Sequence, residues 1–217
     1  CDVRGTGETR LSDGDRGRTS GSTSVSASEW MLGETLVGAR LRDLRTVLRY
    51  LRSRSELDPE RIAIWGESFA PTNSANSNLA VPWDAPNLPH TAEPLGGLLA
   101  MLCAIFEDKI REAYVRCGLL AYSALLETPF VFVPHDAIVP DAVSMGDLEE
   151  VAVRMRKSLK LVNLVDARNR RVSARLTEEA YYRVRPTLNG GPSADWIESA
   201  DQPESAAVWL LKVVRVY

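Results

Sequence analysis

The sequence predicts an α/β fold built around a mainly parallel sheet, and two local patterns carry this prediction. Residues 36–54 have the spacing of an amphipathic helix. Just beyond a short turn, residues 62–65 are apolar on both faces, as strands of a buried parallel sheet are. The same alternation of helix and buried strand returns twice further along the chain. At 217 residues, 45% of them hydrophobic, the chain is of a size to form one domain with a full core.

The helix over residues 36–54 is predicted from apolar side chains that recur at intervals of three and four. They are Val37, Leu41, Leu44, Val47, Leu48 and Leu51. Arginines fall mainly between these positions, at Arg40, Arg42, Arg45, Arg49 and Arg52. We therefore expect a basic, solvated outer face and assign it no function.

A turn and a strand follow this helix. Pro59 restrains Asp58 from the helical conformation and cannot donate a backbone hydrogen bond, so residues 56–60 form a turn. Further elements are predicted as helices over 97–106, 147–156, 177–184 and 203–214, and strands over 113–122 and 159–165. Segments without periodic apolar residues are predicted as loops, over 2–28, about 71–95 and 123–146.

Charge and composition bound the kind of partner. A formal charge of −3 gives no electrostatic reason to expect nucleic acid or an anionic membrane, and favours a small neutral or weakly charged substrate. No stretch approaches the ~20 consecutive apolar residues that cross a bilayer. The three cysteines lack metal-ligand spacing, and we predict Cys103 and Cys117 as small core residues. We expect no metal or organic cofactor.

The stretch from Gly66 to Ala70, Gly-Glu-Ser-Phe-Ala, has the pattern of a nucleophile elbow. In such an elbow a sharp turn after a strand exposes a serine hydroxyl, and small residues two places to each side let strand and helix pass closely. Ser68 is then the nucleophile, and the backbone N–H of Phe69 stabilises the oxyanion. The alternative is a turn serine at a strand end.

The blocks DVRGTGET and MLGETLVGARLRDLRTVLRYLRSRSELDPERIAIWGES resemble the α/β-hydrolase superfamily, within it bacterial acetyl-xylan-esterase-like and prolyl-oligopeptidase-like hydrolases. The resemblance implies a three-layer α/β-hydrolase-like fold with a mainly parallel sheet. It also implies that residues 1–217 form a single domain, the C-terminal two thirds of a hydrolase, with a long insertion at about 71–95. The missing N-terminal strands would then lie upstream of Cys1.

The same resemblance implies an orienting acid at Asp166, which follows the strand in LKLVNLVDARNRRVS. A turn-capping aspartate is the alternative. The family order is serine, acid, histidine, with the histidine in a loop before the last helix. This sequence departs from that order, because its two histidines, His90 and His135, both precede Asp166 and residues 189–204 contain none.

Of the two histidines, His135 is the better candidate for the catalytic base. Its loop, FVPHDAIVPD, is expected on the C-terminal side of the sheet, where open α/β folds bind ligands. A packing role is the alternative, and His90, in the insertion after Ser68, is the second candidate. For Asp2 and Arg4 we expect an ion-paired hinge that holds the first loop against the elbow. Pro71 departs from the pattern too, because it postpones the helix that usually begins at the elbow.

The predicted function is hydrolysis of a carboxylic ester through an acyl-enzyme, with a small-molecule or carbohydrate ester as substrate. An acetylated plant carbohydrate is the class that the resemblance implies, and peptide hydrolysis is the near alternative. The competing hypothesis is a hydrolase fold without turnover that serves as a binding or scaffolding module, motivated by the absence of a late histidine.

Overall fold

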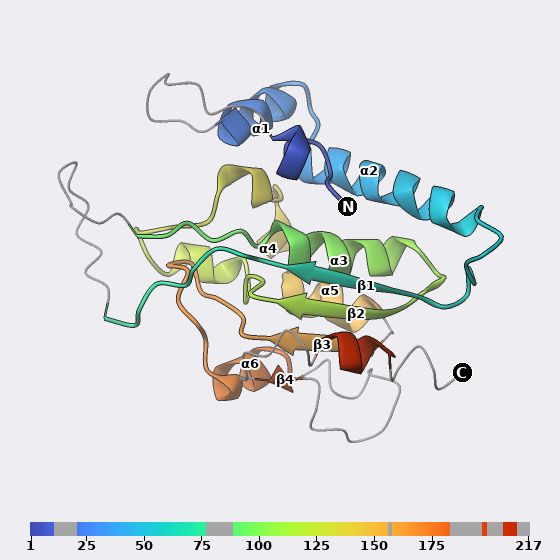
Figure 1. Ribbon diagram of the computed structural model, residues 1–217. Helices are drawn as coiled ribbons and strands as arrows, with labels where there is room; N and C mark the ends of the chain where they lie inside the picture. The colour runs from blue at the N-terminus through green and yellow to red at the C-terminus, as the bar shows by residue number, and fades with distance from the viewer. Residues whose placement is uncertain (11–20, 77–88, 156–157, 183–196, 199–205, 212–217) are drawn as a thin grey trace.

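A computed structural model describes residues 1–10, 21–76, 89–155, 158–182, 197–198 and 206–211 (Figure 1). The helices are α1 (Gly21–Met31), α2 (Leu36–Arg52), α3 (Leu95–Phe106), α4 (Ala142–Met145), α5 (Leu148–Met155) and α6 (Ala174–Ala180). The strands are β1 (Ile62–Glu67), β2 (Ile110–Arg116), β3 (Ser158–Val162) and β4 (Ile197–Glu198). Short 3-10 helices are η1 (Gly7–Thr9), η2 (Ser123–Leu126) and η3 (His135–Ala137), and residues 206–211 are also helical. This alternation confirms the predicted α/β class.

The described strands form one parallel sheet in the order β1-β2-β3-β4. Its register places Glu67 of β1 beside Arg116 of β2, and Arg116 beside Val162 of β3. Because neighbouring strands run the same way, their carboxyl ends lie at one edge of the sheet (Figure 1). The loops that follow β1, β2 and β3 therefore gather at that edge, which is where ligands bind in open α/β sheets.

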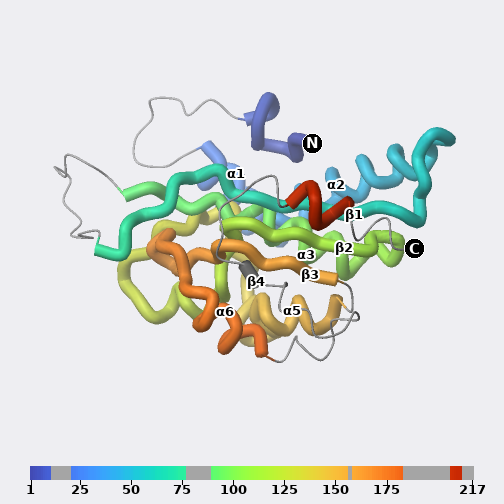
Figure 2. Tube along the Cα trace, turned by 60° about the horizontal axis from the view of Figure 1, so that its bottom comes forward, coloured from blue at the N-terminus to red at the C-terminus, as the bar shows by residue number. Residues whose placement is uncertain are grey.

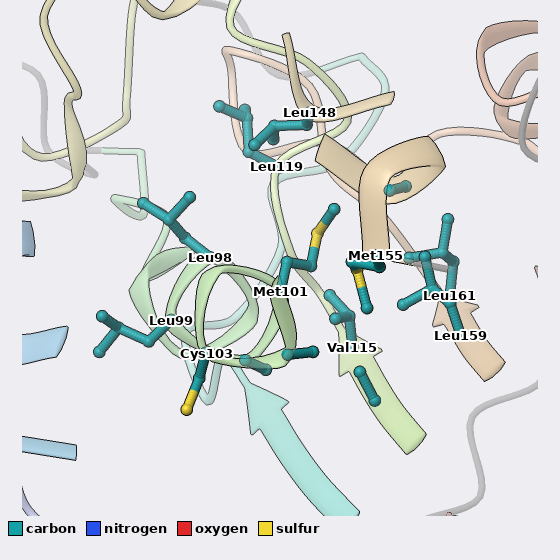
Figure 3. Close-up of a cluster of buried hydrophobic side chains, with 14 of the residues drawn as sticks. Leu98, Leu99, Met101, Cys103, Val115, Leu119, Leu148, Met155, Leu159 and Leu161 are labelled. Atoms are coloured by element: carbon teal, nitrogen blue, oxygen red, sulfur yellow. The ribbon is translucent and has the colours of Figure 1, made fainter. Parts of the chain in front are cut away.

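Helices cover both faces of the sheet. Side chains of α3, β2, α5 and β3 meet in the main core, where Met101, Val115, Met155 and Leu159 are buried (Figure 3). A smaller cluster lies on the opposite face, where Trp209 of the helical segment 206–211 contacts Tyr114, with ring centroids 5.9 Å apart. The trace of this helical segment is red in Figure 2. Cys103 and Cys117 are buried, as predicted.

Two strands end earlier than predicted, and for one shared reason. Cys117, just after β2, has φ 53°, and Asn163, just after β3, has φ 51°. The two residues are neighbours, because the Cys117 amide donates to the Val162 carbonyl at 2.9 Å. The positive φ values interrupt the extended backbone of both strands at the same level. Pairing then resumes only as an isolated bridge between Leu119 and Val165.

Helix α1 was not predicted. The sequence indicates a loop over 2–28, whereas residues 21–31 are helical, so the loop prediction is wrong there. Its only buried residue is Ser26, so α1 has no apolar stripe from which a helix could be recognised. A helix of this length depends on tertiary contacts for its stability, and α1 makes such contacts with η3.

Several predictions fall partly outside the described residues. These are residues 11–20 of the loop predicted over 2–28, residues 77–88 of the insertion, the last residue of the helix predicted over 147–156, the end of the helix predicted over 177–184, most of the segment 189–204, and both ends of the helix predicted over 203–214. In the ranges that are described, no helix is long and apolar enough to cross a membrane.

A buried carboxyl group on β2 makes the stability of the protein depend on pH. Glu112 is 2% exposed, and its Oε2 atom has no hydrogen-bond partner among the described residues. Burial raises the pKa of Glu112 from 4.5 to about 7, although a hydrogen bond with Ser158 and the charge of Arg111 act in the opposite direction. The folded protein therefore holds this proton more tightly than the unfolded chain does.

We expect the free energy of unfolding to fall as the pH rises from about 4.5 to about 7, since in that window the folded state keeps a proton that the unfolded state has lost. The loss should be roughly 3 kcal/mol, at about 1.4 kcal/mol for each pH unit of displaced pKa. Urea denaturation of the wild type and of Glu112→Gln at pH 5 and pH 8 measures it. The difference between the two pH values should shrink in Glu112→Gln, and an equal difference in both proteins would contradict this assignment.

Candidate active site

Ser68 follows β1 directly, at the carboxyl edge of the sheet. Its amide donates to the Arg116 carbonyl at 3.1 Å, which continues the ladder by one residue, and its Oγ accepts from the Ala70 amide at 3.3 Å. The residue is 5% exposed. Its φ is not positive, unlike that of Cys117 one strand away. The Ser68 backbone thus lacks the left-handed conformation that strains a sharp elbow.

The close crossing of strand and helix expected at the elbow does exist, but α3 provides it. A Cβ atom on Gly66 would lie 2.0 Å from the Gly96 carbonyl oxygen, so glycine is required where β1 meets the first turn of α3. The chain reaches α3 only after the insertion that begins at Pro71. Ala70 lies at a bend just before this insertion and does not begin a helix, whereas the elbow pattern places the small residue after Ser68 in a helix that starts at the elbow.

The backbone after Ser68 offers one donor to a ligand. The Phe69 amide makes no hydrogen bond within the described residues, and the Phe69 side chain is 83% exposed. An amide in this position can stabilise a negative oxygen that develops beside Ser68. This fits the role predicted for Phe69.

Asp166 lies in the loop after β3, and its carboxylate accepts hydrogen bonds from residues of that loop. Oδ1 accepts from the Arg168 and Arg170 amides, both at 2.9 Å. Oδ2 accepts from Nε and Nη2 of Arg170 at 2.9 and 2.6 Å. These contacts correspond to a turn-capping aspartate, the alternative reading of this residue, and they leave its role as an orienting acid a prediction.

His135 begins η3 in the connection between β2 and α5, and α1 holds its ring. The imidazole Nδ1 lies 3.0 Å from the Ser26 hydroxyl, and the ring centroid lies 4.6 Å from that of Trp30. Ser26 and Trp30 are one helical turn apart, so they face the same way. Ser26 is 1% exposed, whereas His135 is half-buried.

The acid beside His135 serves a different partner. Asp136 accepts a hydrogen bond from Nη1 of Arg40 at 2.7 Å, and the side chains are 11% and 1% exposed. Arg40 also donates from Nε to the Arg4 carbonyl at 2.9 Å. This buried arginine therefore ties together α2, the first loop and η3. The expectation of a solvated outer face is wrong for Arg40.

The first loop is held by a different ion pair from the one expected. Arg4 pairs with Asp43 of α2, through Nε at 2.8 Å and Nη2 at 2.6 Å, and this hydrogen bonding lowers the pKa of Asp43. Asp2 instead accepts from the Glu8 amide at 2.9 Å. The contacts of Arg4 anchor the first loop to α2, whereas the prediction was an ion-paired hinge against the elbow.

The structure brings Ser68, His135 and Asp166 to loops at one edge of the sheet, but no two of them share a hydrogen bond or ion pair in the described part of the chain. His90 is exposed, and its imidazole has no hydrogen-bond partner there. None of the cysteine, histidine, aspartate and glutamate side chains within the described ranges gather in threes that could hold a metal ion.

Hydrogen bonds between backbone groups, and from the Asn73 side chain to backbone groups, connect these loops to one another. Asn73, after β1, donates from Nδ2 to the Arg168 carbonyl at 2.8 Å. The Phe132 amide, in the connection after β2, donates to the Ala167 carbonyl at 2.8 Å. Asn73 also exchanges two hydrogen bonds with the His90 backbone, at 3.0 and 2.8 Å. The loops that carry the candidate residues are therefore fixed relative to each other.

Sequence reasoning missed Ser26, Trp30 and Arg40. For Arg40 a signal existed, because it lies three residues after Val37 and four before Leu44, on the apolar stripe of α2. Ser26 and Trp30 belong to a helix without an apolar stripe. No pattern in the sequence points to their contacts with a residue 109 positions from Ser26.

Comparison with known proteins supports the fold. No family model matches the chain, and no curated protein matches it. A solved structure of similar fold is that of a presumed acetyl xylan esterase from Bacteroides fragilis, with 15% sequence identity and a TM-score of 0.57. The match covers 92% of this chain and 45% of that protein, so the chain spans less than half the length of its structural neighbour.

Proposed function

We propose that this chain carries an esterase-type hydrolase site with Ser68 as its nucleophile. The observation that supports it is the position of Ser68, directly after β1 at the carboxyl edge of a parallel sheet and next to the Phe69 amide, which has no hydrogen-bond acceptor among the described residues. The likeness in fold to an acetyl xylan esterase supports the same chemistry. The resemblance of the block ending in Ile-Trp-Gly-Glu-Ser to the α/β-hydrolase superfamily points the same way.

In this proposal Ser68 Oγ attacks the carbonyl carbon of an ester while His135 takes the hydroxyl proton. The Phe69 amide donates to the oxyanion of the tetrahedral intermediate. The bond from the carbonyl carbon to the alcohol oxygen then breaks, and His135 returns the proton to the departing alcohol. Water attacks the acyl-enzyme in the same way, which releases the carboxylic acid and restores Ser68.

For the substrate we propose an uncharged ester, with an acetylated carbohydrate as the first choice. The net charge of −3 offers no general attraction for an anionic substrate. Peptides would pass through the same acyl-enzyme, so they remain the alternative within this chemistry.

A fluorophosphonate probe tests the proposed nucleophile, because it reacts with activated serine hydroxyls. We expect one labelled site, located by mass spectrometry at Ser68, and no labelling of Ser68→Ala. Labelling should also weaken in His135→Ala and stay unchanged in His90→Ala. Label on another serine, or none on a folded protein, would contradict the proposal.

A second candidate function is a binding or scaffolding module that has lost turnover. The hydrogen bonds of the Asp166 carboxylate with Arg170, together with the absence of a positive φ at Ser68, favour it. This candidate predicts that the folded protein neither reacts with the probe nor hydrolyses esters.

A further inference from the structure

We infer that Ser26 of α1 positions His135, holding the imidazole in the tautomer whose Nε2 can accept a proton. The inference rests on the proposed function for its catalytic meaning, but the tautomer is a property of the folded protein and is measurable without turnover. Ser26 is a positioning residue in this account, since the proton itself moves between Ser68 and His135.

The geometry fixes the imidazole from two sides. Ser26 Oγ lies 3.0 Å from Nδ1 and 3.4 Å from the carbonyl oxygen of the same histidine. Trp30 packs on the ring at 4.6 Å with an interplanar angle of 48°. Both partners come from α1, so one helix sets the position and the rotation of the ring. Nε2 has no hydrogen-bond partner among the described residues.

Only one tautomer uses both contacts of the Ser26 hydroxyl. A hydroxyl has a single proton to donate and two lone pairs that accept. If its proton goes to the His135 carbonyl, Oγ can accept from a protonated Nδ1, and both contacts become hydrogen bonds. If Nδ1 is unprotonated, Nδ1 and the His135 carbonyl oxygen are both acceptors, and the single hydroxyl proton can be donated to only one of them. The arrangement therefore favours Nδ1–H and leaves the Nε2 lone pair available to take a proton.

Burial strengthens this preference. Ser26 is 1% exposed, so water does not compete for its hydroxyl, and a hydrogen bond in a dry site weighs more than one in solvent. The nearby carboxylate cannot supply the same restraint, because Asp136 binds the buried guanidinium of Arg40. Asp166 in turn is occupied by Arg170. The hydroxyl of Ser26 thus takes the orienting role that a carboxylate has in most serine hydrolases.

Nitrogen NMR of ¹⁵N-histidine-labelled protein tests the inference. The chain has two histidines, so His90→Gln assigns the His135 signals directly. At pH 9, where imidazoles are ordinarily neutral, we expect the Nδ1–H tautomer for wild-type His135. A predominantly Nε2–H tautomer in the wild type would overturn the inference, whatever the variants do.

Variants on the same helix sharpen the test. Ser26→Ala should shift His135 toward the Nε2–H tautomer, and Ser26→Thr, which keeps the hydroxyl, should restore the wild-type signal. Ser28→Ala is the matched control, because Ser28 is exposed and bonds to the Ser24 carbonyl. Asp166→Asn should leave the tautomer unchanged. A shift in Asp166→Asn with none in Ser26→Ala would return the orienting role to Asp166.

Kinetics provide the second readout. With p-nitrophenyl acetate, Ser26→Ala should lower kcat by about tenfold or more with KM little changed, since a proton acceptor contributes on the order of 10²–10⁴ and only its orientation is lost. Ser26→Thr should recover most of that rate. If the wild type has no esterase activity but the tautomer responds to Ser26→Ala, the proposed function fails and the positioning by Ser26 stands.

Discussion

Replacing Ser68 with alanine is expected to lower kcat/KM for p-nitrophenyl acetate by 10³-fold or more. The reason is that the variant removes the atom that forms the acyl-enzyme while leaving the Phe69 amide and the substrate contacts in place. Residual hydrolysis should then equal that of a site which binds the ester but cannot form a covalent intermediate with it. Initial rates over a range of substrate concentrations measure the effect.

Two controls make this prediction specific. Ser55→Ala alters an exposed serine in the turn before β1 and should retain wild-type turnover. The Ser68→Ala protein should also keep its thermal midpoint within a few degrees, because Ser68 Oγ accepts a single hydrogen bond within the described ranges, from the Ala70 amide. Equal turnover by folded wild type and folded Ser68→Ala would exclude the ester hydrolase and favour the binding module.

Replacing Asp136 with alanine should lower the free energy of unfolding by about 3–5 kcal/mol, the usual cost of leaving one charge of a buried ion pair uncompensated. The Arg40 side chain is 1% exposed, and in the variant its only remaining described partner is the Arg4 carbonyl. Urea denaturation at pH 7 measures the change. We also expect Asp136→Ala to loosen η3, and with it the ring of His135.

Two further variants test whether the expected loss of stability is specific to the buried ion pair between Arg40 and Asp136. Glu34→Ala breaks the exposed pair between Glu34 and Arg42 and should cost less than about 1 kcal/mol. The double variant Arg40→Met, Asp136→Leu should be more stable than Asp136→Ala alone, because it removes both charges. If Asp136→Ala costs no more than Glu34→Ala does, the proposed role of the Arg40 pair is wrong.

The sequence predicted the elements in which apolar spacing and packing agree. Helix α2 and strand β1 follow from local periodicity, and α3 follows from an apolar run long enough to be a helix. The ends of β2 and β3 could not be read in this way. They depend on positive φ at Cys117 and Asn163; asparagine tolerates this conformation, but neither residue type requires it, so the sequence does not mark these strand ends.

The site was predictable in position but not in contacts. The strand that precedes Ser68 places it at the carboxyl edge, and the order of strands brings the loops of His135 and Asp166 to the same edge. Which partner each side chain takes depends on elements far away in sequence or on competing neighbours. His135 meets a helix 109 residues earlier, and Asp166 meets an arginine four residues later.

Two hydrogen bonds between the Asn73 side chain and the His90 backbone join the two ends of the segment between these residues. Gly66 of β1 and Gly96 of α3, which pass close to each other, both lie outside this segment, so their contact does not depend on the length of the chain between residues 73 and 90. Lengthening a closed loop costs little entropy, only about 0.6 kcal/mol for each doubling. We therefore expect changes in the length of the segment between residues 73 and 90 to leave the contact of β1 with α3 in place.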